Sequence, residues 1–324
     1  MSAPATARLP LGKSLREAFG EAIAELGKTE PRIVVLDGDL GSSTRADIFE
    51  AAHPDRFYQM GIAEQNLLGV AAGMASLGLI PYVSTFACFA VARALDSIRV
   101  LIAQTDLNVK ITGGYAGLLA GMTGKTHLMF NDVAVMRSLA GMTVVSPADE
   151  VETRKALGVI TRHVGPVYLR LSRPATPIVF DEGYEFELGK AVVVREGSDI
   201  TLMSTGTQTA RTLEAAELLA VRGIDVQLLH VPTLKPIDSD AIVDAAARTG
   251  FVITVEEHTV IGGLGGAVAE TLSATYPVRV ERLGIQDIYG ESGPDDALLD
   301  KYGLSAERVA EAVADLVATK RGPQ

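Results

Sequence analysis

The sequence predicts an α/β protein of two domains, each a mostly parallel sheet flanked by helices. Short bursts of β-branched residues alternate with longer stretches that carry helical apolar spacing. The bursts are continuous apolar runs, which is typical of parallel strands covered on both faces. The alternation stops once, over residues 174–188, and then resumes, so we expect a linker between two units.

The first domain, expected over residues 1–173, follows from five such bursts. Strands are expected at 32–37, 80–85, 107–112, 142–147 and 166–171. Helices are expected at 12–27, 63–78, 88–104 and 148–162. The last helix has a clear start signal, because Ser146 or Asp149 can cap it and acidic residues follow in its first turn.

The second domain, expected over residues 189–324, repeats the same rhythm. Strands are expected at 199–205, 225–231, 251–257 and 278–284, and helices near 207–222, 238–248, 264–275 and 305–319. The glycine-rich stretch 255–270 matches a dinucleotide-binding motif only loosely and lacks the acid expected about 20 residues later. We interpret it as a glycine turn that packs a helix against the sheet.

Composition excludes several kinds of partner. The 324 residues include 29 Lys or Arg and 40 Asp or Glu, a net charge of −11, and no basic cluster. Neither nucleic acid nor an anionic membrane is therefore an expected partner. The apolar runs are too broken by Gly and Pro to span a membrane, and residues 1–10 lack the pattern of a signal peptide.

The lone Cys88 cannot form an internal disulfide, and no zinc-type spacing is present. We therefore expect a cytoplasmic protein without metal ligands of its own. The positive mean hydropathy favours a large surface that is covered by another chain.

Glu64 is the first candidate for chemistry, since it is the one charged residue in the run 57–86. One interpretation is a helix-start carboxylate favoured by the helix dipole. The other is a buried acid that shares a proton with a heterocyclic nitrogen, because carboxylates are seldom buried without a partner. On the second interpretation we expect that partner to lie outside this chain.

Two further segments contain candidate side chains. Phe86 and Phe89 lie three apart at a strand-to-helix junction, where they are either ordinary core or a wall for a planar ring. Arg93 follows one turn later and could pair with a nearby carboxylate. The long glycine-rich loop 113–132 contains His127, which suits either a structural role or proton handling and substrate binding.

Taken together, these segments resemble the carboxyl-terminal half of transketolase, a thiamine-diphosphate enzyme. The similarity covers nearly the whole chain, and "GIAEQN" (61–66) followed by "STFACF" (84–89) is its most specific part. The resemblance implies a pyrimidine-binding fold over 1–173 and a transketolase C-terminal-like domain over 189–324. The diphosphate-binding motif G-D-G…N of the family is not found in this sequence.

The resemblance therefore implies one subunit of a split transketolase. An N-terminal partner subunit would hold the diphosphate and Mg²⁺ (or Ca²⁺), in an assembly expected to be α₂β₂. Glu64 would hydrogen-bond N1′ of the aminopyrimidine of thiamine diphosphate. Phe86 and Phe89 would flank its ring, with Arg93 nearby and Asp39 lining the pocket. His127 would act in catalysis and, by the same resemblance, Arg16, Ser43 and Arg173 would bind the anionic group of a sugar.

The substrate loop departs from the family pattern. Tyr115 stands where family members carry a histidine, Thr123 where they carry an aspartate that contacts the donor, and Leu128 where they carry a glutamine. His127 is retained. Because polar mismatches are costly in a closed site, we expect two-carbon ketol transfer from an atypical ketose, such as a sulfo-, deoxy- or branched sugar.

Two alternatives remain open at this point. One is a β-type chain of a 2-oxo-acid dehydrogenase, which shares the layout but differs around the glutamate. The other is a non-catalytic scaffold subunit, an interpretation that Tyr115 and Thr123 keep open and that Glu64, Phe86 and Phe89 oppose.

Overall fold

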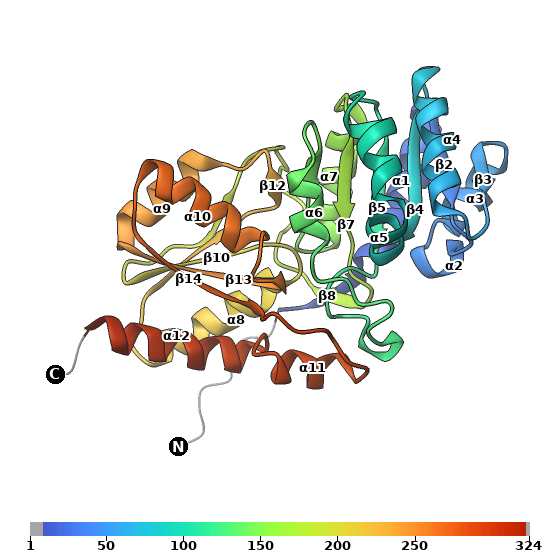
Figure 1. Ribbon diagram of the computed structural model, residues 1–324. Coiled ribbons are helices and arrows are strands. Elements are labelled where there is room, and N and C mark those ends of the chain that lie inside the picture. The colour runs from blue at the N-terminus through green and yellow to red at the C-terminus, as the bar shows by residue number, and fades with distance from the viewer. Residues whose placement is uncertain (1–8, 322–324) are drawn as a thin grey trace.

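A computed structural model describes residues 9–321, except for the side chains of residues 320 and 321 (Figure 1). It confirms an α/β protein with two sheet-based domains that lie side by side. The expectation of no signal peptide concerns residues 1–10, of which 1–8 lie outside the described part. Within residues 9–321, no helix combines the length and apolarity needed to cross a bilayer.

The first domain is built on a seven-stranded sheet of order β12-β6-β7-β5-β4-β2-β3. Its strands are β2 (Ile33–Asp37), β3 (Phe57–Gln59), β4 (Ile80–Phe86), β5 (Lys110–Gly114), β6 (Thr143–Val145), β7 (Val167–Arg170) and β12 (Thr233–Lys235). All neighbours run parallel except the edge strand β12, which is antiparallel to β6. Its helices are α1 (Leu15–Thr29), α2 (Gly41–Thr44), α3 (Asp47–Ala52), α4 (Glu64–Ser76), α5 (Ala87–Ser97), α6 (Asp132–Ser138) and α7 (Glu150–Arg162).

Helices cover both faces of this sheet because alternate strand residues point to opposite sides. On β2, Val34 and Leu36 belong to the apolar core beneath α4, α5 and α6. Ile33 and Val35 belong to the core beneath α1, α3 and α7. Every residue of β2, β4 and β5 is buried, as expected for central strands of a sheet that is covered on both faces.

Local signals set two helix starts in this domain. The Ser14 side chain accepts a hydrogen bond from Glu17 N, and the Glu17 carboxylate accepts one from Ser14 N, which makes a capping box for α1. Asp149 caps α7 by accepting from Glu152 N at 2.8 Å, as one of the two predicted caps. Its other oxygen accepts from Val179 N and Phe180 N, so the same carboxylate also holds the inter-domain segment.

The second domain is built on a five-stranded sheet of order β14-β13-β10-β11-β9, in which only β9 is antiparallel. Its strands are β9 (Val192–Arg195), β10 (Ile200–Ser204), β11 (Val226–His230), β13 (Phe251–Thr259) and β14 (Arg279–Ile285). Its helices are α8 (Gln208–Val221), α9 (Ser239–Thr249), α10 (Leu264–Thr275), α11 (Asp295–Lys301) and α12 (Ala306–Arg321). The predicted glycine turn is present: α10 begins after Gly263, and Gly265 packs closely on Thr254 and Arg282.

The segments between the domains are more ordered than a linker suggests. Within the expected linker 174–188, β8 (Ala175–Pro177) pairs with β1 (Leu11–Ser14) near the amino terminus. Farther along the chain, β12 belongs by sequence to the second domain but pairs with β6 at the edge of the first sheet. Figure 1 shows it between the two domains. A second difference concerns the expected helix 88–104, which breaks at Ala94 and continues as a π-helical segment, Ile98–Ala103.

A buried polar network joins the two domains. Glu152 on α7 accepts from His230 Nε2 on β11 at 2.8 Å and from the Tyr184 hydroxyl at 2.6 Å. Glu152 and His230 have no exposed side-chain surface. Since buried carboxylates need partners, this network ties α7 to the second sheet.

Candidate active site

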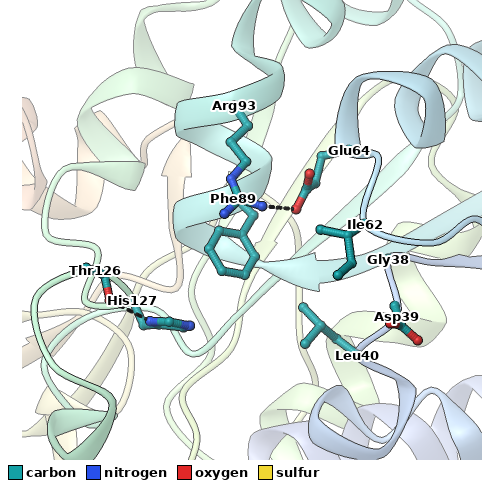
Figure 2. Close-up of a pocket in the computed structure, with 9 residues that line it drawn as sticks. All are labelled: Gly38, Asp39, Leu40, Ile62, Glu64, Phe89, Arg93, Thr126 and His127. Carbon is teal, nitrogen blue, oxygen red and sulfur yellow. Dashed lines mark hydrogen bonds and ion pairs between the residues drawn. The ribbon is translucent and has the colours of Figure 1, made fainter.

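The candidate site is a cavity at the carboxyl ends of β2 and β4, the edge at which parallel α/β sheets bind ligands. Its volume is about 270 Å³. The lining residues come from the loop after β2, the start of α4, helix α5 and the loop after β5 (Figure 2). They are Gly38, Asp39, Leu40, Ile62, Glu64, Phe89, Arg93, Thr126 and His127.

Glu64 is the first residue of α4 and is 5% exposed. Its Oε1 accepts a hydrogen bond from Arg93 Nη1 at 2.8 Å, as Figure 2 shows. The expectation that Glu64 has no partner in this chain is therefore wrong. Arg93 reaches it from α5, and the predicted pairing of Arg93 with a nearby carboxylate is confirmed.

The second wall of the cavity is aromatic. The Phe89 ring lies 4.0 Å beneath the Arg93 guanidinium, and its centroid is 5.3 Å from that of the His127 ring. Phe86 is buried behind this wall, stacked between Phe89 and Tyr115 at centroid distances of 5.6 and 4.0 Å. Phe89 therefore lines the cavity, whereas Phe86 supports it from the core.

The loop after β2 forms the third wall. Asp39 has a positive φ of 65°, and its backbone N–H donates to Gln59 Oε1. Next to it, Asp37 is fully buried and accepts from Leu40 N at 2.8 Å and from Gln59 Nε2 at 3.1 Å. Burial raises the pKa of Asp37, and hydrogen bonds from Leu40 N and Gln59 oppose that rise. Asp37 thus fixes the turn that presents Asp39 and Leu40 to the cavity.

The predicted anion-binding residues meet on the far side of the stacked rings. Arg16 donates through Nη1 to Ser43 O at 2.7 Å and through Nε to Arg173 O at 3.1 Å. The Arg16 and Arg173 guanidiniums lie 5.8 and 5.7 Å from the centroid of the Tyr115 ring. Within the described residues, neither arginine forms an ion pair with a carboxylate, so this end of the site is positively charged.

Of two loop residues predicted to belong to the site, His127 lines the cavity and Thr123 does not. His127 lies at the cavity edge, with Nδ1 2.9 Å from Thr126 Oγ1 (Figure 2). Thr123 is exposed, its hydroxyl donates to Ala120 O, and it is not among the cavity-lining residues. The structure thus brings His127 to Phe89 and Glu64 but leaves Thr123 outside the cavity.

Four lining residues were not anticipated from the sequence: Gly38, Leu40, Ile62 and Thr126. Leu40 and Ile62 carry no chemical signal, although each lies within two residues of a predicted site residue. Ile62 is 73% exposed, which is unusual for isoleucine next to a cavity. It fits a cavity whose remaining wall is provided by another molecule.

The cavity suits one part of a cofactor. A carboxylate on one side and an aromatic face on the other fit a planar heterocycle that both hydrogen-bonds and stacks. Within residues 9–321, no group of three or more His, Cys, Asp or Glu side chains is arranged to hold a metal ion. The Glu64 carboxylate and the Phe89 ring, which line one cavity, are the residue types that fit the aminopyrimidine end of thiamine diphosphate.

Comparisons with known proteins show the family of the chain. Residues 12–178 match the family "Transketolase, pyrimidine binding domain", and residues 189–309 match "Transketolase, C-terminal domain". The chain is 41% identical over 306 residues to a 6-deoxy-6-sulfo-D-fructose transketolase subunit of Clostridium sp., covering 94% of this chain and 95% of that relative. It is 37% identical over 303 residues to an apulose-4-phosphate transketolase subunit of Phocaeicola vulgatus, with coverage of 93% and 97%.

A solved structure described as a split gene transketolase, inactive beta4 tetramer, superimposes with a TM-score of 0.87 at 47% identity. The match covers 94% of this chain and 98% of that one. Both domain matches, in the order seen in the fold, span most of the sequence. This chain belongs to the transketolase family.

Proposed function

We propose that this chain is the subunit of a split transketolase that binds the pyrimidine half of thiamine diphosphate. The observation that carries the proposal is the position of Glu64, buried at the start of α4 and facing the same cavity as the Phe89 ring. When bound, thiamine diphosphate supplies the carbon nucleophile and electron sink for two-carbon ketol transfer. The protein contributes orientation and proton control.

Glu64 would hold a proton at N1′ of the pyrimidine. Its Oε1 is engaged by Arg93, so Oε2 is the oxygen available to the ring. Arg93 keeps the carboxylate oriented, because it is itself held over the Phe89 ring. Phe89 would stack on the ring, with Phe86 behind it and Asp39 at the rim of the pocket.

His127 would handle a proton of the substrate. The Phe89 ring edge and the Thr126 hydroxyl fix its imidazole at the mouth of the cavity, within reach of a group bound above the pyrimidine. Arg16, Ser43 and Arg173 would bind the anionic end of the sugar, beyond the Tyr115 ring.

The proposal includes a partner chain. An N-terminal transketolase subunit would bring the diphosphate site and Mg²⁺ (or Ca²⁺), and we propose an α₂β₂ assembly in the cytoplasm. The names of both relatives as subunits, and the coverage of at least 95% of their length, support this division. The structural relative is titled an inactive tetramer of β chains, which agrees with a requirement for the partner.

We propose an atypical ketose as donor. Tyr115 stacks on Phe86 beside Arg16 and Arg173, so a bulky ring stands where family members have a smaller, polar imidazole. One relative is named for 6-deoxy-6-sulfo-D-fructose and the other for apulose 4-phosphate, which supports selectivity of this kind. A sulfo-, deoxy- or branched ketose would meet the same arginines.

The test is reconstitution with the N-terminal subunit encoded nearest to this chain. Turnover of a panel of ketoses should depend on thiamine diphosphate and Mg²⁺, and 6-deoxy-6-sulfo-D-fructose or apulose 4-phosphate should exceed xylulose 5-phosphate as donor. Equal activity on xylulose 5-phosphate and on these sugars would refute the proposed selectivity. Turnover that is independent of thiamine diphosphate would refute the function itself.

A further inference from the structure

The loop that carries Tyr115 and His127 is anchored by the second domain. The side chains of Leu118 and Leu119 are buried in the core formed by β10, β13, α8 and α12 of that domain. Farther along the loop, Gly121 N donates to Asp295 Oδ1 at 2.9 Å, and Phe130 O accepts from Thr259 N at 2.7 Å. The loop therefore starts and ends in the first domain, while its middle belongs to the second.

Glu257 on β13 is the centre of this anchor. Its Oε1 accepts from Leu118 N at 2.6 Å and from Leu119 N at 3.0 Å. Its Oε2 accepts from Arg211 Nη2 at 2.9 Å and from the Thr207 hydroxyl at 3.3 Å. Glu257 is 3% exposed, so donors from the loop and from the α8 region together satisfy one buried charge.

The loop packs so closely against Glu257 that it has little room to move. Gly117 has a φ of +79°, and a Cβ added there would overlap Glu257 Oε1 and lie 3.0 Å from Arg170 Nη2. Gly117 N also donates to Met129 O at 2.9 Å, which joins the two arms of the loop. Tyr115 lies two residues before Gly117, and His127 lies two residues before Met129.

Arg170 on β7 ties the same anchor to the first domain. Its Nη2 donates to Glu257 O at 2.9 Å, and its Nε donates to Asp132 Oδ2 at 2.8 Å, where α6 begins. Although burial by itself would raise the pKa of Asp132, the Arg170 guanidinium holds that pKa below its usual range. Hydrogen bonds thus connect both ends of the loop to one polar cluster around Glu257.

We propose that Glu257 is a positioning residue for the substrate: through Leu118 and Leu119 it fixes the loop that carries Tyr115, behind the aromatic wall, and His127, at the cavity. The second domain then acts as the anchor of the substrate loop. This inference rests on the proposed function for its kinetic part only. The cofactor walls, Glu64 and Phe89, are not held by Glu257, so loss of the anchor should affect the substrate and spare the cofactor.

The experiment compares three variants in the reconstituted complex. Glu257→Gln removes the charge that Arg211 needs, and Gly117→Ala disturbs the anchor from the loop side without removing any charge. Glu152→Gln is the control, since Glu152 is equally buried between the domains but contacts His230 and Tyr184 and not the loop. Amide hydrogen exchange of the peptide 115–131 and the kinetic constants for the donor are measured in each.

Glu257→Gln and Gly117→Ala should each speed exchange in 115–131 about tenfold and raise the donor KM about tenfold, with kcat and thiamine diphosphate affinity changed less. Glu152→Gln should leave both loop exchange and donor KM unchanged. Unchanged loop exchange in both test variants, or faster exchange without a change in KM, would overturn the inference. If the wild-type complex turns over no ketose, the proposed function fails, and hydrogen exchange still decides whether Glu257 anchors the loop.

Discussion

Lys110, at the start of β5, leads to a quantitative prediction about stability. Its side chain is fully buried, and its Nζ donates to His163 O at 2.8 Å and Gly165 O at 2.9 Å. No carboxylate within residues 9–321 forms an ion pair with it. Burial lowers the pKa of Lys110 from 10.5 to about 7. The substitution Lys110→Met removes this titration and keeps a side chain of similar length.

The pH dependence follows from the difference between folded and unfolded chains. Between pH 7 and 10.5 the unfolded chain keeps the Lys110 proton while the folded chain has lost it. The unfolding free energy of the wild type should therefore rise with pH, by about 1.4 kcal/mol per unit relative to Lys110→Met. Over pH 7.5 to 9.5 the difference between the two proteins should change by about 2–3 kcal/mol.

Urea unfolding monitored by circular dichroism measures this difference, because the chain contains no Trp for fluorescence detection. The control is Lys28→Met, because Lys28 is 61% exposed and should not alter the slope. Wild type and Lys110→Met with parallel stability profiles from pH 7.5 to 9.5 would refute the reasoning, because the amine would then be charged in the folded protein as well.

Three further predictions concern other parts of the molecule. Burial raises the pKa of Glu256 to about 7, so the unfolding free energy of the wild type should fall by about 2–3 kcal/mol relative to that of Glu256→Gln as pH rises from 4.5 to 7. Urea unfolding of both proteins at pH 5 and 7.5 checks this, and a difference between them that does not change with pH would contradict it. Asp149→Ala leaves three backbone N–H groups without their acceptor, so unfolding free energy should fall by about 3 kcal/mol; an unchanged urea midpoint would show that other groups replace the carboxylate. Tyr115→His should shift the ratio of kcat/KM between sulfo-sugar and xylulose 5-phosphate at least about tenfold toward xylulose 5-phosphate. Tyr115→Phe keeps the stack on Phe86 and should change this ratio less. Equal ratios in both variants would show that Tyr115 does not determine selectivity.

Much of the fold could be predicted because the central strands are buried on both faces. β2, β10 and β11 consist entirely of buried residues, most of them apolar, and their positions agree with expectation within one or two residues. The edge elements could not be predicted in this way. β1, β8 and β12 have three or four residues each, and their partners are distant in the sequence, so no local period marks them.

The candidate site shows the same division. Glu64, Phe89 and His127 could be proposed because each has an unusual local setting, and the structure brings them to one cavity. The pairing of Glu64 with Arg93 spans 29 residues and depends on how α5 packs beside α4, which no local pattern reports. The hydrogen bonds from Leu118 N and Leu119 N to Glu257 also join distant parts of the chain, although two adjacent acids inside the apolar strand 251–259 are a signal that Glu257 has buried partners.

The most direct test of the central claim is the turnover of the reconstituted complex with Glu64→Gln. Glutamine retains the shape of the side chain and cannot hold the pyrimidine proton as a carboxylate does. With Arg93→Met as a control for loss of the ion pair alone, Glu64→Gln should lower thiamine-diphosphate-dependent turnover by about 100-fold or more while assembly with the partner persists. Turnover by Glu64→Gln equal to that of the wild type would contradict the assignment of this cavity as the pyrimidine site.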